Sequence, residues 1–299
     1  MRFFLSLLFV FNCLTSIAAE VSITIDDPKL DSFYLSTEKR DQRILKALDN
    51  RGLKAALFVC GMRVDSDAGK EILNAWSDAG HLIANHSYSH HYFHSKKISL
   101  KDFEADFAKN ESLIRDLKGF EPYFRYPYLK EGDTLDKRDG FRRFLKAKGY
   151  RMGSVTIDAS DWYVSQRLEQ RLRDNPNSNL APYRDFYLRH IWSRAQYYDT
   201  LSKQVLGRSV KHTLLIHHNL LNALFLPDLL TMFEQKGWKL INAKDAFADP
   251  VFESQVNILP AGESILWALA KEAGQFEKEL RYPAEDGEYE REEMNRLGL

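Results

Sequence analysis

The stretch Glu-Val-Ser-Ile-Thr-Ile-Asp-Asp, residues 20–27, decides the fold of this chain. Apolar residues alternate with polar ones from Val21 to Ile25, which is the period of a β-strand, and the run stops at Asp26 and Asp27 before a proline. Two carboxylates at the end of a strand indicate a candidate functional site, because the loops of a parallel sheet converge at the carboxyl ends of its strands. Taken alone, such a pair is also typical of a turn or a helix cap.

Strand-like and helix-like segments alternate along the rest of the chain. Further strands are expected at residues 54–60, 81–84, 123–126, 152–157, 213–216 and 239–241. Helical spacing is found at residues 42–53, 68–79, 100–117 and 225–236. Repeated strand–helix units of this kind predict an α/β fold around a parallel sheet, either open or closed into a barrel.

The composition excludes several classes of protein. Among 299 residues, 42 Lys and Arg balance 42 Asp and Glu, whereas a general nucleic-acid binder shows a clustered basic excess. The hydrophobic content of 44% and the aromatic content of 13% are ample for a packed core, which excludes a disordered chain. Cys60 lies in an apolar run and is expected to be a buried small hydrophobe.

The ends of the chain differ from its middle. Residues 1–19 combine one positive charge, a short apolar run and small residues near Ala18 and Ala19, which predicts a signal peptide and an exported protein. No other segment is apolar for long enough to span a bilayer. A catalytic domain is expected over residues 20–250, with a polar insertion at about 163–208, followed by a helical extension and charged tail at 251–299. We expect the insertion and the tail to be solvated surface.

A second polar group follows the strand expected at 81–84. His86 and His90 are spaced i and i+4, which places two imidazoles on one face of a helical turn and suits a shared metal ion. The serines between them have hydroxyls that can cap a turn. Without other motifs, two histidines at this spacing are more often surface or core residues than metal ligands. His91 and His94 follow, and we interpret them as neighbours on the solvent side.

Three more strand ends carry polar residues. Arg125 stands in an aromatic stretch, where burial requires a carboxylate partner, and Asp26 is a plausible one. The segment from Asp158 to Trp162 ends the strand expected at 152–157, and two adjacent histidines follow the apolar run at 213–216. Each motif has an ordinary interpretation as an ion pair or a core histidine. All of them at the ends of strands indicate one shared site.

Five motifs in this order resemble the polysaccharide deacetylase family, carbohydrate esterases that include chitin and peptidoglycan deacetylases. The motifs are T-[FI]-D-D at Thr24–Asp27, H-[ST]-x-x-H at His86–His90, R-x-P-[YF] at Arg125–Tyr128, D-x-x-D-W at Asp158–Trp162 and L-x-H at Leu215–His217. The resemblance implies a distorted (β/α) barrel of about seven parallel strands. It also implies a divalent metal, usually zinc, with cobalt, nickel or iron as alternatives.

The same resemblance assigns a role to each residue of the motifs. The metal ligands would be Asp27, His86 and His90, two imidazoles and one carboxylate that leave positions open for water and substrate. Proton transfer and its support would involve a base, Asp26, held by Arg125, and an acid, His217, tuned by Asp161. The substrate would meet the backbone N–H near Tyr128 and the side chains of Trp162 and Leu215.

These roles predict a metal-dependent hydrolase that removes acetyl groups from N-acetylated sugars of a polysaccharide or oligosaccharide. The alternatives are a carbohydrate-binding pseudoenzyme on the same fold and a hydrolase of another C–N or O-acetyl bond. A zinc peptidase is disfavoured because the chain lacks H-E-x-x-H. His218 stands where many family members have Asp, so His217 and His218 both compete for the acid role, and the L-x-H register favours His217.

Overall fold

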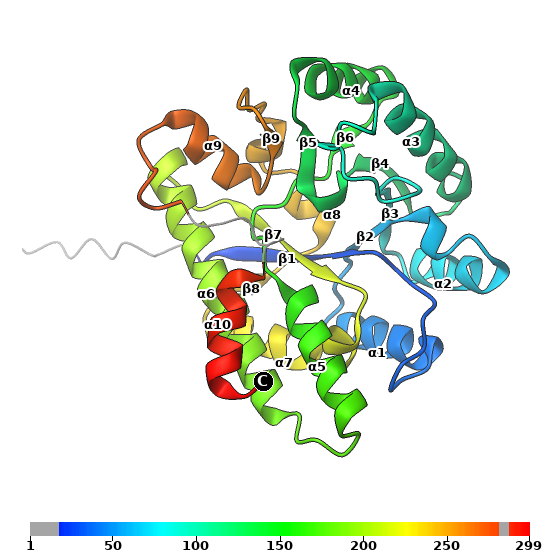
Figure 1. Cartoon of the computed structure of the whole chain (residues 1–299), viewed down its shortest axis with the longest axis vertical. Coiled ribbons are helices and arrows are strands. Elements are labelled where there is room, and N and C mark those ends of the chain that lie inside the picture. The colour runs from blue at the N-terminus through cyan, green and yellow to red at the C-terminus, as the bar shows by residue number, and fades with distance from the viewer. Residues whose placement is uncertain (1–17, 281–286) are drawn as a thin grey trace, which may run out of the picture.

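A computed structural model describes residues 18–280 and 287–299 of the chain, and the segment expected as a signal peptide therefore lies almost entirely outside the described residues. A seven-stranded sheet, parallel throughout, forms its centre (Figure 1). Its strands are β1 (Glu20–Asp26), β2 (Ala56–Val59), β3 (Leu82–Asn85), β4 (Phe120–Phe124), β6 (Arg151–Met152), β7 (Lys211–His217) and β8 (Lys239–Leu240). The order is β6-β4-β3-β2-β1-β7, with β8 also paired to β1.

The sheet curls toward closure between its two outer strands. After β6 the chain crosses to β7, where the N–H of Ile157 donates to the carbonyl of Thr213 and the N–H of Leu215 donates to Ile157. The strand expected at 152–157 is therefore divided, because its first residues pair with β4 and its last residue pairs with β7. The parallel α/β fold and its distorted barrel are confirmed.

The first strand is buried on both of its faces. Ser22 and Thr24, the polar residues of its alternating pattern, have no exposed surface, and their hydroxyls donate to the carbonyls of His212 and Leu214 on β7. A hydroxyl that is bonded in this way avoids the cost of burying an unpaired polar group. Alternation between polar and apolar residues here marks strand pairing rather than a face open to solvent.

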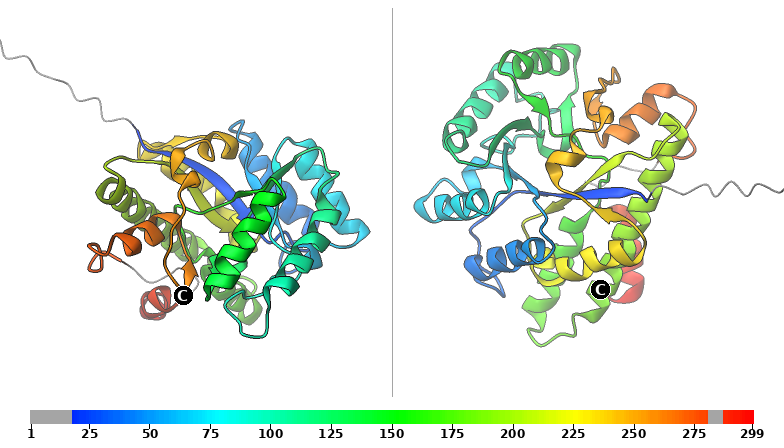
Figure 2. Two further views of the ribbon diagram at one scale, coloured as in Figure 1. Left: turned by 90° about the horizontal axis from the view of Figure 1, so that it is seen from above. Right: turned by 180° about the vertical axis from the view of Figure 1, so that it is seen from behind.

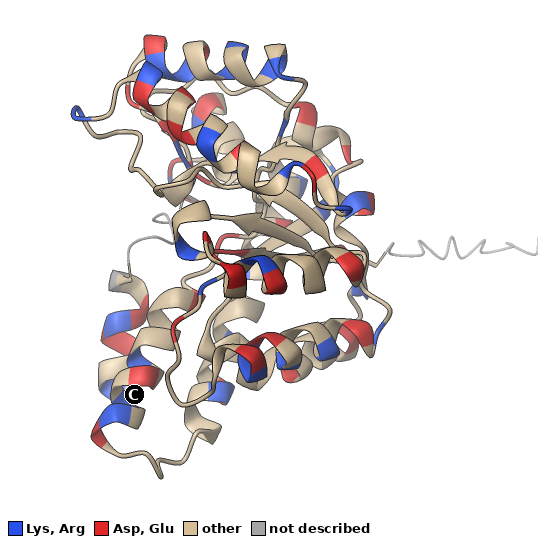
Figure 3. Cartoon of the chain, turned by 90° about the vertical axis from the view of Figure 1, so that its right-hand side faces the viewer, with Lys and Arg blue, Asp and Glu red and all other residues tan. Residues whose placement is uncertain are grey.

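Helices surround the curled sheet (Figure 2), and acidic and basic residues are interspersed along them (Figure 3). In chain order they are α1 (Thr37–Asp49), α2 (Asp67–Asp78), α3 (Leu100–Ile114), α4 (Leu135–Ala147), α5 (Asp161–Asp174), α6 (Ala181–Leu206), α7 (Leu220–Gln235), α8 (Ala243–Ala246), α9 (Ile265–Ala273) and α10 (Glu288–Leu297). Short 3-10 turns occur at η1 (Gly61–Arg63), η2 (Pro127–Leu129) and η3 (Pro250–Glu253), and β5 (Lys130–Gly132) pairs antiparallel with β9 (Ala261–Gly262). None of the described helices is long and apolar enough to cross a membrane.

The inserted segment is not the solvated surface that its polar composition suggested. It forms most of α5 and all of α6, and α6 buries Tyr183, Phe186, Tyr187 and Ile191 in the main core. These four residues recur at helical spacing and form an apolar face of the helix. Three of them are aromatic and polar residues separate them, so the segment reads as polar overall. The charged tail also packs against this helix where it is described, since Glu290 of α10 forms a buried ion pair with Arg194 (Figure 1).

A separate aromatic cluster supports the loop after β4. Its central ring, Phe141 of α4, is fully buried and contacts six other rings: Phe93, Phe103, Phe107, Phe124, Tyr126 and Phe144. Tyr126 adjoins Arg125, so this cluster fixes the position of a residue predicted to belong to the site.

Replacement of Phe141 by Ala should lower the free energy of unfolding by about 3–5 kcal/mol, because it leaves a cavity among packed rings. Urea denaturation of the purified protein measures this loss. Leu135→Ala, at an exposed position on the same helix, is the matched control and should change stability by less than about 0.5 kcal/mol. Equal stability of the two variants would contradict the role given to this cluster.

Candidate active site

The polar motifs meet in one cavity of about 400 Å³ at the carboxyl edge of the sheet. Asp26 and Asp27 end β1, and His86 and His90 follow β3, while the other wall carries residues from the loop after β4, from α5 and from the end of β7. Of the residues predicted for the site, those that line the cavity are Asp26, Asp27, His86, His90, Tyr128, Trp162, Leu215 and His217. Arg125 and Asp161 lie behind them and contact them through hydrogen bonds.

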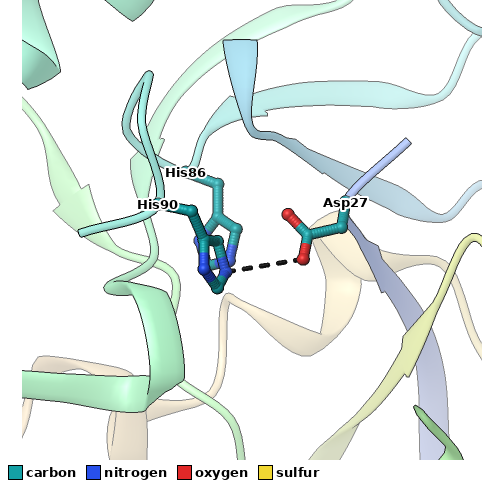
Figure 4. A group of neighbouring side chains, drawn as sticks. All are labelled: Asp27, His86 and His90. Atoms are coloured by element: carbon teal, nitrogen blue, oxygen red, sulfur yellow. Dashed lines mark ion pairs between the residues drawn. The ribbon is translucent and has the colours of Figure 1, made fainter. Parts of the chain in front are cut away.

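Asp27, His86 and His90 face one another across this cavity (Figure 4). One potential ligand atom from each lies within 4.8 Å of the other two, and His90 Nε2 is 3.4 Å from Asp27 Oδ2. No other group of three or more such ligands was found among the described residues. The two expected neighbours do not join it: the side chain of His91 is 39% exposed, and His94 bonds to the carbonyl of Ala261.

The protonation of these three side chains suits a cation. Burial lowers the pKa of His86 and of His90 to about 4, so both imidazoles are neutral at pH 7. His86 Nδ1 is 2.8 Å from the carbonyl of Arg125 and donates to it, which leaves Nε2 with a free lone pair toward the cavity. Burial opposes ionisation of Asp27, but the nearby His90, His86 and Arg63 outweigh it and lower the pKa of this carboxyl. Two neutral imidazoles and one carboxylate fit a divalent metal.

The loop that carries the two histidines is not the helical turn predicted from their spacing. Residues 86–90 contain no helix, and Ser87 and His90 have φ of 63° and 52°, in the left-handed region. The expected caps also differ, since the Ser87 hydroxyl has no hydrogen-bond partner among the described residues and Asp106 of α3 accepts the loop's N–H groups instead. The i, i+4 spacing therefore reaches a common ligand point through a strained loop rather than through helical periodicity.

Asp26 and Arg125 form a buried ion pair beside the histidines. Arg125 Nη1 lies 2.5 Å from Asp26 Oδ1, and the two side chains are 1% and 3% exposed. Burial raises the pKa of Asp26 to about 6, against the opposing charge of Arg125. Arg125 also donates from Nε to the carbonyl of Gly153 and lies over the ring of Phe58. The partner predicted for this arginine is present, and Asp26 Oδ2 lies 3.6 Å from His86 Nε2.

The two adjacent histidines after β7 point to opposite sides. His217 lines the cavity, and its Nδ1 lies 2.7 Å from Asp161 Oδ1. His218 also borders the cavity, but its side chain is fully buried and places Nε2 3.3 Å from Asp41 Oδ1. Burial alone would lower the pKa of His217, but the charge and hydrogen bond of Asp161 outweigh it and raise this pKa to about 9. A protonated imidazole therefore faces the neutral pair at pH 7.

The Asp161 carboxylate is held by several donors that the sequence did not reveal. Asn219 and Asn222, on the first turn of α7, each donate from Nδ2 to Asp161 Oδ2 at 2.8 Å. The hydroxyl of Tyr187, on the inserted helix α6, lies 2.5 Å from Asn222 Oδ1 and fixes which end of that amide faces Asp161. Asn219 also caps α7 by accepting from the N–H of Asn222, so an N-cap signal was the only sequence trace of this group.

Apolar side chains line part of the same cavity. Leu215 packs with Leu129 and Val155, and Trp162 lines the same cavity from α5. Tyr128 is 43% exposed, with its ring 4.6 Å from that of His90, and its backbone has φ of 55°. A left-handed conformation at a non-glycine residue stores strain, and such residues gather at functional sites.

A further cation escaped the sequence analysis. Arg63, at the end of η1, places Nε 3.3 Å from Asp27 Oδ1. Nothing in the local sequence identifies Arg63 as a site residue, because its partner lies 36 positions earlier in the chain. Gln166 and Glu169 also line the cavity, from successive turns of α5.

Comparisons with known proteins found similar sequences and similar folds. Residues 15–152 match the family model for polysaccharide deacetylases. A peptidoglycan-N-acetylglucosamine deacetylase of Bacillus cereus is 27% identical over 146 residues, which cover 48% of this chain and 46% of that protein, so the match spans less than half of the relative.

Two solved structures share the fold at low identity. A peptidoglycan N-acetylglucosamine deacetylase, crystallised with a benzamide compound, has a TM-score of 0.51 at 19% identity over 77% of this chain and 88% of that one. A CE4 family pseudoenzyme from Bacillus anthracis has a TM-score of 0.51 at 16% identity over 77% and 65% of the two chains. Over residues 15–152 the chain is therefore similar to the polysaccharide deacetylase family, and the two solved structures share its fold.

Proposed function

We propose that this chain is a metal-dependent hydrolase that removes acetyl groups from N-acetylated sugars of a polysaccharide or oligosaccharide. One observation carries the proposal. Around a single cavity lie a neutral histidine pair with a carboxylate, an aspartate held from behind by Arg125 and a protonated histidine held from behind by Asp161. Hydrolysis of an amide needs an activated water, a proton acceptor and a proton donor, and this cavity offers a group for each.

Asp27, His86 and His90 would hold the metal, and zinc is the first choice, with cobalt, nickel or iron as alternatives. When bound, a divalent cation lowers the pKa of its water and polarises a carbonyl. The pairing of His86 Nδ1 with a backbone carbonyl orients this ligand before any ion arrives.

The remaining residues would move protons and hold the acetamido group. Asp26 accepts the proton of the attacking water, and the ion pair with Arg125 keeps its carboxylate in place. His217 then donates a proton to the departing nitrogen, so that the products are acetate and a free amine. The N–H of Tyr128 would stabilise the negative oxygen, while Trp162 and Leu215 would enclose the acetyl methyl group.

A sugar-binding pseudoenzyme is the second candidate. We consider it because one of the proteins with a similar fold is a pseudoenzyme. Against it, this chain keeps every residue of the five motifs. Hydrolysis of an O-acetyl or another C–N bond would use the same groups, so a panel of substrates must distinguish these activities.

The cavity chemistry generates a prediction about activity. Purified protein should release acetate from at least one of chitooligosaccharides, peptidoglycan, poly-N-acetylglucosamine and acetylxylan. A chelator should abolish the release, and zinc or cobalt should restore it. Acetate from acetylxylan alone would assign O-deacetylation, and glycan binding without any acetate would indicate the pseudoenzyme.

Matched variants separate ligand from base in that experiment. Asp27→Ala should lose metal, whereas Asp26→Asn should keep it and lose most turnover, because an amide cannot accept the water's proton. Equal metal loss in both variants would contradict the separate roles given to the two aspartates.

The His217–Asp161 pair generates a prediction about pH. The acid must carry its proton, so activity should fall as the pH rises through the pKa of His217, and Asp161→Asn should move this fall to lower pH. His217→Ala should reduce kcat by about 10²–10⁴-fold with metal retained. His218→Ala is the control and should leave the alkaline fall in place. A pH profile that is unchanged in Asp161→Asn would contradict the assignment.

We also propose that the protein is exported after cleavage of residues 1–19, on the pattern of charge, apolar run and small residues at its start. Amino-terminal sequencing of protein from the medium or periplasm should begin near Glu20. A protein that is found only inside the cell and begins at Met1 would contradict export.

A further inference from the structure

We propose that Asp106, on α3, is a positioning residue that holds the loop between the two histidines in the shape a metal requires. The inference rests on the proposed metal site and goes beyond it, because Asp106 lies outside all five motifs. It is 18 and 17 residues away from the two loop residues that it contacts.

Two backbone groups of the loop converge on this carboxylate. Asp106 Oδ2 accepts from the N–H of Tyr88 at 2.9 Å and from the N–H of Ser89 at 3.0 Å. Both donors lie between His86 and His90, so the carboxylate ties down the centre of the segment whose ends carry the ligands. The next turn of the same helix adds Lys109, whose Nζ lies 3.4 Å from the centre of the Tyr88 ring.

The loop requires such a restraint because its backbone is strained. Ser87 and His90 have left-handed φ, which is unfavourable for residues other than glycine, and such conformations persist only when their surroundings enforce them. Asn85 contributes by accepting the N–H of Ser87 at 2.9 Å. Without Asp106, the N–H groups of Tyr88 and Ser89 lose their acceptor and the segment can relax.

The carboxylate is suited to this position by burial as well as geometry. Asp106 is 8% exposed, and His91 Nε2 is 3.9 Å from Asp106 Oδ1, beyond hydrogen-bond distance. The charge is thus directed mainly at the two N–H groups, and bonds to an ionised acceptor are stronger than neutral ones. A neutral isostere would keep the shape and weaken the restraint.

Zinc affinity, measured on the full chain by competition with a chelating dye, tests this inference with the metal alone. Asp106→Ala should weaken zinc binding by about 10–100-fold, the usual effect of losing a partner that orients a ligand. Asp106→Asn should show a smaller loss, because its amide oxygen can still accept an N–H. Amide hydrogen exchange at Tyr88 and Ser89 should accelerate in the order wild type, Asn, Ala.

Two controls separate positioning from loss of charge or of stability. Asp65→Asn removes a negative charge that contacts the same loop through the Tyr88 hydroxyl at 2.8 Å, and its zinc affinity should match the wild type. Asp102→Asn disrupts the capping box of α3, which lowers stability, and should also leave zinc affinity unchanged.

The outcomes distinguish this inference from the proposed function. If wild type binds zinc and Asp106→Ala binds it equally well, the positioning role is overturned and the metal site stands. If wild type binds no zinc, both fail. Should Asp106→Ala not fold, Asp106→Asn decides, and an unchanged affinity in that variant overturns the inference.

Discussion

The buried pair between Asp26 and Arg125 is the interaction on which the site depends. Arg125 binds the Asp26 carboxylate at the end of β1, the carbonyl of Gly153 after β6 and the face of Phe58 on β2, while its own carbonyl accepts from His86. One residue thus connects four segments at the carboxyl edge of the sheet. Removing either partner of a buried ion pair leaves an uncompensated charge, which typically costs about 3–5 kcal/mol. We therefore expect this pair both to stabilise the fold and to position the proposed base.

The surroundings give the same side-chain type opposite states within one cavity. Burial lowers the pKa of His86 and His90, so both remain neutral, whereas Asp161 raises the pKa of His217 and keeps it protonated. The difference follows from the partner of each Nδ1, since His86 donates to an uncharged carbonyl and His217 to a carboxylate. Neutral imidazoles suit metal ligands, and a protonated one suits an acid.

The inserted helices belong to this arrangement rather than decorating it. α5 begins at Asp161 itself and contributes Trp162, Gln166 and Glu169 to the cavity. α6 reaches the same carboxylate indirectly, because Tyr187 orients the amide of Asn222. The predicted acid is therefore supported by residues from three successive helices.

Sequence periodicity and motif chemistry by themselves determined the parallel strands, their chain order, and the chemistry-bearing residues at their carboxyl ends. The same pattern placed His217 and His218 on opposite sides, because adjacent strand residues alternate. The pairs Asp26–Arg125 and Asp161–His217 were expected, and the fold brings them together across 99 and 56 residues. Tertiary structure alone revealed Arg63 beside Asp27 and the two asparagines, Asn219 and Asn222, that bind Asp161. It also replaced the predicted helical turn at His86 with a strained loop tied to Asp106, and packed the polar insertion into the core. Local patterns report which face of an element is apolar, whereas the shape of a loop and the choice of a partner depend on contacts between residues that only the folded chain brings together.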